Sequence, residues 1–283
     1  MKRRILIVLI VLVVAALSVW VYADLRWMDV TAVEIAMLDD AASAHPSTPL
    51  NWSGLDTLPA PVVNFFRACL SDSGRRISTL KIEQEGTFRL SGDEDSWTSF
   101  TARQTYSTSR PGFVWDARIS MLPGVHAYVR DSYILGKGAM TGAVLGVFPL
   151  MDQRDTPGLN TGELYRYLAE TIWFPSRLLP SEGVRWRAID DSTALATLQD
   201  GALSASIEFH FAPDSTVKRL YASDRPREVK GQYIRTPWEI RCASMTEKPE
   251  RIPLHCEVAW ILPTGRFPYF RGLVTNVVTR YSY

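Results

Sequence analysis

The chain has 283 residues, of which 46% are hydrophobic and 22% charged, a composition typical of a folded globular protein rather than a disordered one. Its formal net charge is +1, so the chain has no excess of basic residues of the kind on which nucleic-acid binding depends. We therefore expect no nucleic-acid partner. The four histidines are scattered without metal-ligand spacing, and no serine stands in a nucleophile-elbow motif. We therefore expect no metal site and no cofactor.

The N-terminal residues predict a membrane segment. Three basic residues at positions 2–4 precede an uncharged apolar run from Ile5 to Tyr22, which is long enough to cross a bilayer as a helix. Aromatic residues lie at its far end, and the basic end should stay in the cytoplasm. We predict that residues 1–23 are a single-pass anchor in the inner (cytoplasmic) membrane, with the rest facing the periplasm or the cell exterior. A signal peptide cleaved after Ala23 is the alternative.

The next residues, 24–54, have first a helical composition and then many Pro, Ser and Thr, and predict a helical extension followed by a linker. Residues 55–283 predict a single domain. A helix should begin at Pro61, and from Ile77 onward the apolar period changes to two, with turn residues such as Pro123 and Gly124 between the segments. The fold class is therefore α+β: a strongly curved antiparallel sheet or an incomplete β-barrel packed on a central helix.

That central helix is predicted over Gly162–Phe174, with Thr161 as its cap and Pro175 as its end. On its polar side Arg166 is spaced to pair with Glu163 and Glu170. The preceding stretch, residues 136–150, is small, apolar and rich in glycine. It predicts a mobile lid, formed by a short helix or a loop.

Two of the three cysteines can form a disulfide. Cys242 and Cys256 flank a polar loop that holds residues 248–250, between two predicted strands. Facing strands bring two sulfur atoms close enough for a bridge, and an oxidising compartment favours it. Two buried thiols are the alternative.

The strings RYLAE (166–170), WFP (173–175) and LLP (178–180) resemble a bacterial family of domains of unknown function, whose members carry an N-terminal hydrophobic segment. The resemblance extends from about Leu58 to the C-terminus, and it implies no particular activity. More loosely, a curved sheet with a helical lid is similar to the lipoprotein-carrier architecture, in which an unclosed barrel holds lipid. This likeness rests on the pattern of elements alone.

Nine tryptophans and the one-sided strands favour binding of an apolar molecule, such as a lipid chain, without catalysis. The cavity is expected beneath the central helix. Its predicted contact residues are Trp173 and Phe174 as the roof, Trp115, Ile119 and Val129 as the sheet wall, and Met140, Leu145 and Phe148 as a movable edge.

Two other hypotheses stay open. A hydrolase or isomerase would need at least two of the groups Asp116, Asp131, His126 and Glu170 to meet in one pocket. An envelope assembly module would instead present exposed aromatic residues to a partner. The alternating stretch 125–132 places polar residues on the face opposite the apolar one, either as a polar cleft or as a solvated face: His126, Tyr128 and Arg130.

Overall fold

A computed structural model describes residues 1–43, 51, 53–70, 76–89, 96–246 and 252–282. In this part of the chain, one antiparallel sheet has 13 strands in the order β6-β5-β4-β3-β2-β1-β13-β12-β11-β10-β9-β8-β7. The strands are β1 (Arg76–Arg89), β2 (Trp97–Ser107), β3 (Gly112–Leu122), β4 (Val125–Ile134), β5 (Lys137–Val144), β6 (Phe148–Arg154), β7 (Arg185–Asp190), β8 (Thr193–Asp200), β9 (Leu203–Phe211), β10 (Val217–Val229), β11 (Gln232–Met245), β12 (Pro253–Leu262) and β13 (Gly265–Ser282).

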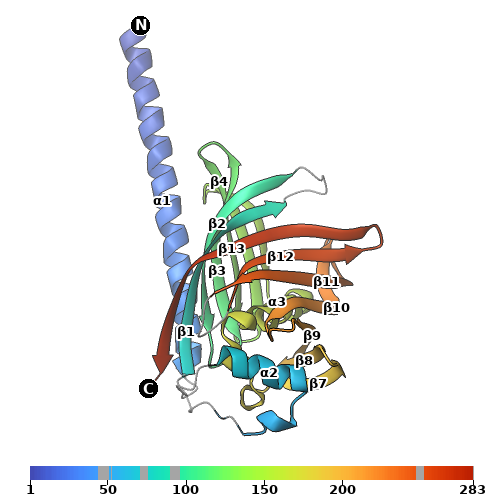
Figure 1. Ribbon diagram of the computed structural model, residues 1–283. Helices are drawn as coiled ribbons and strands as arrows, with labels where there is room; N and C mark the ends of the chain where they lie inside the picture. The colour runs from blue at the N-terminus through green and yellow to red at the C-terminus, as the bar shows by residue number, and fades with distance from the viewer. Residues whose placement is uncertain (44–50, 52, 71–75, 90–95, 247–251, 283) are drawn as a thin grey trace.

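The sheet is strongly curved and open, which confirms the predicted α+β class (Figure 1). Successive hairpins build two halves, and the first and last strands, β1 and β13, join them at the centre. Irregularities in the β1–β13 register, such as that between Glu83 and Gln84, are of the kind that bends a strand. The edge strand β6 then approaches the other half of the sheet, since the Tyr233 hydroxyl of β11 donates to Gln153 Oε1 of β6 at 3.2 Å.

The helix α3 (Pro157–Glu170) lies on the concave side and contacts β4 and β5 from one half and β9 and β10 from the other. The predicted start at Gly162 and the Thr161 cap were wrong. Thr156 caps the helix, its Oγ1 accepting from the Leu159 amide at 3.4 Å, and Pro157 follows it at a position where no amide is needed. The Thr161 hydroxyl instead donates to the Pro157 carbonyl at 2.8 Å. Short 3₁₀ turns, η2 (Thr171–Trp173), η3 (Pro175–Leu178) and η4 (Pro180–Glu182), carry the chain onward to β7.

The predicted lid over residues 136–150 was also wrong, because this stretch forms β5, a turn and the start of β6. Leu145 and Gly146 form the turn with positive φ angles of 53° and 69°. Gly138 lets α3 approach the sheet, since a Cβ there would lie 3.0 Å from Leu159 Cγ and 3.1 Å from Glu163 Cγ. These glycines therefore allow a tight turn and close packing.

The helix α1 is continuous from Lys2 to Ser43 and has two different parts. Every residue from 1 to 22 is exposed, and this segment projects beyond the sheet (Figure 1). The second part packs on the outer face of β2, β3 and β4 through buried Trp27 and Leu38. The predicted helical extension after residue 23 is thus present up to Ser43. Residues 44–50 and 52 of the predicted linker lie outside the described residues, as do residues 248–250.

Two members of the polar row predicted on β4 are covered by α1 instead of lining a cleft or facing water. Arg130 is 4% exposed, and its Nε lies 3.1 Å from Glu34 Oε1 of α1. Its Nη1 donates to Thr31 Oγ1 at 3.0 Å, and its Cζ lies 4.7 Å from the Trp27 ring centroid. Tyr128 meets Trp27 edge-on at 5.7 Å. The sequence pattern located this face correctly, but it contained no signal for the helix that covers it.

The helix α2 (Ala60–Cys69) closes the end of the sheet away from the N-terminus (Figure 1). A 3₁₀ turn, η1 (Leu55–Thr57), precedes it, and Pro61 lies in its first turn as predicted. Its buried rings contact the strands: Phe65 lies 5.6 Å from Phe211, and Phe66 lies 6.3 Å from Trp186. The side chains buried between α2, α3 and the sheet include residues of β8, β9 and β10.

Candidate functional site on the concave face

Aromatic side chains from six strands contact one another on the concave face; three of them are buried (Phe100, Trp115 and Trp238) and the others are half-buried. The ring of Phe100 lies 6.1 Å from Trp115 and 5.0 Å from Phe270. Across the sheet, Trp260 stacks on Tyr269 at 5.9 Å, with an interplanar angle of 18°. We call this set the aromatic wall, and its members are Phe88, Phe100, Trp115, Trp238, Trp260, Tyr269 and Phe270.

Two arginines of β10 border the aromatic wall. Arg225 Cζ lies 4.4 Å from the Trp238 ring centroid, and Arg227 Cζ lies 5.7 Å from that of Trp260. Arg225 is 8% exposed, and its Nε donates to the Gly162 carbonyl of α3 at 3.2 Å. The aromatic wall therefore contacts two cationic side chains, and one of them also binds α3.

A buried ionic cluster links α3 to the sheet. Arg166 Nη1 donates to Asp131 Oδ2 of β4 at 2.5 Å, and its Nε donates to Glu170 Oε1 at 2.8 Å. The other oxygen of Glu170 accepts from Gln104 Nε2 at 2.8 Å and from the Tyr106 hydroxyl at 3.0 Å. The spacing of Arg166 and Glu170 along the helix was predicted on the side opposite the apolar stripe, whereas in the structure both groups face the sheet.

The carboxyl groups of this cluster have perturbed acidities. Burial raises the pKa of Glu163 to about 8, and the negative charge of Asp131 adds to this effect. Burial also raises the pKa of Asp131, because the cost of desolvation exceeds the attraction of Arg166. Among the described residues, Asp131 Oδ1 and Glu163 Oε2 are buried and accept no hydrogen bond. A Glu163 carboxyl with a pKa of about 8 keeps its proton near neutral pH.

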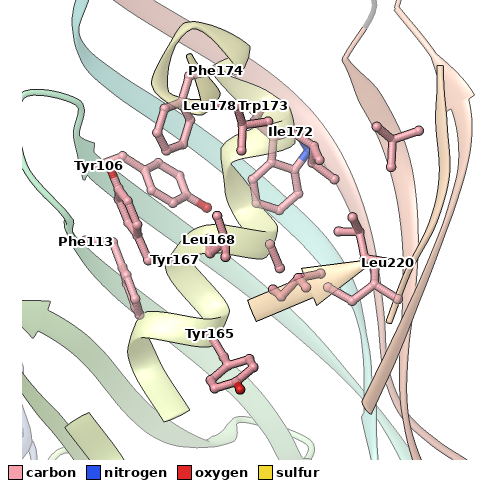
Figure 2. Close-up of a cluster of buried hydrophobic side chains, with 14 of the residues drawn as sticks. Tyr106, Phe113, Tyr165, Tyr167, Leu168, Ile172, Trp173, Phe174, Leu178 and Leu220 are labelled. Carbon is pink, nitrogen blue, oxygen red and sulfur yellow. The ribbon is translucent and has the colours of Figure 1, made fainter. Parts of the chain in front are cut away.

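Beneath the end of α3 the side chains are closely packed (Figure 2). Phe174 is fully buried and lies 5.1 Å from the ring of Tyr106 and 5.9 Å from that of Tyr167. Trp173 lies 6.1 Å from Tyr106, and its Nε1 donates to the Pro253 carbonyl at 2.9 Å. Both residues predicted as the roof of a cavity thus belong to the packed core around η2.

The other predicted contact residues lie on neighbouring strands. The register pairs Val129 with Ala117, Ile119 with Ala127, and Met140 with Asp131, which places Trp115, Ile119, Val129 and Met140 on the concave face. Phe148 begins the edge strand β6 and is 62% exposed, while Leu145 lies in the turn before it. The structure therefore places four of the eight residues on the concave face, two of them buried (Trp115 and Ile119) and two half-buried (Val129 and Met140). Of the other four, two lie at the edge of this face and two lie in the core under α3.

The groups proposed for acid–base chemistry are divided between the two faces. Asp131 and Glu170 meet at Arg166 on the concave side. Asp116 lies on the outer face, where its Oδ1 accepts from Trp27 Nε1 of α1 at 2.8 Å. His126 lies on the same outer face by strand alternation.

The wall residues Phe88, Phe100 and Phe270 were missed by reasoning from the sequence. They form one surface only because β1 pairs with β13, and these strands lie far apart in the sequence. The alternating pattern placed Phe88 and Phe100 on one sheet face, but it contained no signal for that pairing.

An open depression of about 410 Å³ lies on the opposite, outer face, over Arg241, Glu257 and Arg271.

Comparison with known proteins yields one family. The pattern of a family of unknown function, DUF6920, matches residues 56–278. No curated protein matches the sequence significantly. Among solved structures, a porin-like protein from Bacteroides uniformis aligns over 73% of this chain and 96% of its own, with 9% identity and a TM-score of 0.23. A likeness this weak carries no argument about fold or function.

Proposed function

Because the chain belongs to DUF6920, a family that is defined without an activity, we propose its function from its own geometry. The protein is a membrane-anchored, extracytoplasmic protein that binds an apolar molecule, such as a lipid chain, without catalysis. The binding surface is the concave face of β3 to β5 together with the aromatic wall.

The observation that carries this proposal is an apolar concave surface that is not fully covered. Several of its side chains are only half-buried, although they sit inside the curve of the sheet: Phe88, Val129, Met140, Trp260, Tyr269 and Phe270. Concave, mostly apolar surfaces with a few polar groups at their border are the usual form of small-molecule sites. Each methylene of a bound chain would contribute about 0.8 kcal/mol, so a short contact suffices for useful affinity.

The anchor supports the same function, because it places the binding surface at a lipid source. The apolar window of α1 has a mean hydropathy of 3.0, and none of it is buried in the protein. Its length and composition suit a transmembrane helix, and a signal sequence has the same properties. We favour the anchor because Ala23, the candidate cleavage residue, lies inside a continuous helix whose next turns pack on the sheet.

Native mass spectrometry of the full chain, purified in mild detergent, tests the binding. We expect the protein to carry an adduct of lipid mass, and the variant Met140→Glu, which places a charge on the concave face, to lose it. The matched control is Thr141→Glu, on the other face of the same strand, and it should retain the adduct. Since both variants keep α1, lipid attached to the anchor would remain in both. An unchanged adduct in a folded Met140→Glu protein would refute the proposed site.

A further inference from the structure

The exposed apolar side chains of the domain gather in two places. Outside α1, nine large apolar residues are exposed in the described part of the chain; two of them end β3 at the β3–β4 turn, and three lie in the first four residues of the edge strand β6, after the β5–β6 turn. We call these five the apolar rim: Met121 (43% exposed), Leu122 (67%), Phe148 (62%), Leu150 (50%) and Met151 (38%). Such a concentration of exposed apolar area marks a surface that is covered in use.

Contacts with α1 show where the rim lies along the axis of this helix, relative to its apolar residues 5–22. At the β5–β6 turn, a Cβ on Gly146 would lie 3.5 Å from the Ala23 carbonyl oxygen. Ala23 follows the last residue of the apolar run, Tyr22. This turn therefore lies where the bilayer surface would be if residues 5–22 span the membrane.

The β3–β4 turn lies still closer to the N-terminus of α1. Tyr128 contacts Trp27, and the turn between Leu122 and Val125 is several residues further along the strands. A strand advances about 3.3 Å per residue, against about 1.5 Å for a helix, so this turn extends beside the apolar run. Figure 1 shows the β3–β4 hairpin reaching along α1 toward its N-terminus.

We propose that the apolar rim inserts into the surface of the bilayer that α1 spans. Two separate turn tips beside a transmembrane helix suit a fluid lipid surface, whereas a second copy of the chain would require a flat or complementary face. Insertion of the rim keeps the concave face directed toward the membrane and at a constant distance from the bilayer surface. The proposal rests on the anchoring part of the proposed function, and it does not require that a ligand is bound.

Thiol labelling of the full chain in nanodiscs tests this insertion. Single-copy discs of phosphatidylcholine and phosphatidylglycerol in a 3:1 ratio expose both membrane surfaces and exclude a second copy. The variants are Leu122→Cys and Phe148→Cys, and Leu135→Cys is the matched control, because Leu135 is 50% exposed at the β4–β5 turn. A water-soluble maleimide reacts with thiols in water and not with thiols in hydrocarbon. The unmodified chain gives the background from the native cysteines.

We expect labelling at position 135 and none above background at 122 and 148, while all three positions react after denaturation. Equal labelling of the three positions in discs would overturn the proposal. Protection that appears only in discs with two copies would overturn it as well, in favour of a contact between copies. Neither outcome affects the lipid adduct expected by native mass spectrometry, so the two proposals can fail separately.

Discussion

Arg166 connects α3 to β4 through a buried ion pair. It pairs with Asp131 and Glu170, and all three side chains are largely buried. The variant Arg166→Met leaves two carboxylates without their partner in a poorly solvated site, and we expect it to lower the free energy of unfolding by about 3–5 kcal/mol. Chemical unfolding of the full chain in detergent measures this loss.

The control for this prediction is Arg154→Met. Arg154 pairs with Asp152 at 2.6 Å, but their side chains are 50% and 60% exposed. An exposed pair contributes less than about 1 kcal/mol, so this variant should be close to the unmodified protein. Similar small losses in both variants would show that the Arg166 cluster does not hold the helix.

Glu163 makes stability depend on pH in an unusual direction. The unfolded carboxyl loses its proton near the ordinary glutamate pKa of 4.5, whereas the folded one keeps it up to a pKa of about 8. Between these values the folded state binds more protons, so stability falls as pH rises, by at most about 1.4 kcal/mol per pH unit. Glu163→Gln removes this dependence. Its Tm relative to the unmodified protein should therefore rise from pH 5 to pH 8, and a constant difference would contradict the buried proton.

The redox state of Cys242 and Cys256 tests whether the domain faces an oxidising compartment. Cys242 and Cys256 are directly opposite each other on β11 and β12, with their sulfur atoms 3.5 Å apart. If the domain faces an oxidising compartment, we expect a disulfide. Alkylation of denatured, unreduced protein should then modify Cys69 alone, and reduction should release two more thiols. Three modified thiols without reduction would rule the bridge out.

At the scale of elements, the contact between α3 and β5 requires a glycine. A Cβ at Gly138 would lie 3.3 Å from the Leu159 backbone carbon as well as close to two side chains. Gly138→Ala should therefore destabilise the protein by about 1–3 kcal/mol through overpacking.

Gly162→Ala is the matched control, because its Cβ would meet only the Pro226 carbonyl at an ordinary 3.5 Å. Alanine is the better residue inside a helix by up to about 1 kcal/mol, so this variant should be neutral or more stable. Thermal unfolding of the two variants compares them directly. Equal effects would show that α3 does not depend on close approach to β5.

The sequence predicted those elements whose pattern is local. The period-two apolar pattern identified the strands, and Pro61 identified the start of α2. The prediction for Gly136 to Leu150 failed because small residues in a strand and in a loop have the same composition. In the structure the positive φ angles of Leu145 and Gly146 mark the turn between β5 and β6. The cap was missed, but it was readable from the sequence, because Thr156 is followed by Pro157, a residue favoured at the first helical position, whereas Thr161 is followed by Gly162.

The candidate site was only partly predictable for the same reason. Local alternation placed Ile119 and Val129 on one face, and the structure keeps them there. By contrast, Arg166 and Glu170 have the spacing of an exposed helical pair, and only the opposing Asp131 makes them a buried cluster. Trp173 looked like a cavity roof, because a filled core and an empty cavity are lined by the same residue types.

At the scale of the whole molecule, the features combine into one arrangement. The helix α1 projects from the sheet beside the apolar rim, α2 closes the opposite end, and the concave face lies between them (Figure 1). Lipid from the bilayer would then reach the concave surface, and the apolar rim would contact the same bilayer.

Cross-linking with a phospholipid that carries a photoreactive group in its acyl chain tests lipid binding on the concave face most directly. The full chain would be reconstituted with this lipid, irradiated and digested, and the modified peptides identified by mass spectrometry. Modified peptides are expected from α1 and the apolar rim, and also from the concave face at the half-buried Val129 and Met140. Modification confined to α1 and the rim, with none on the concave face, would contradict lipid binding there.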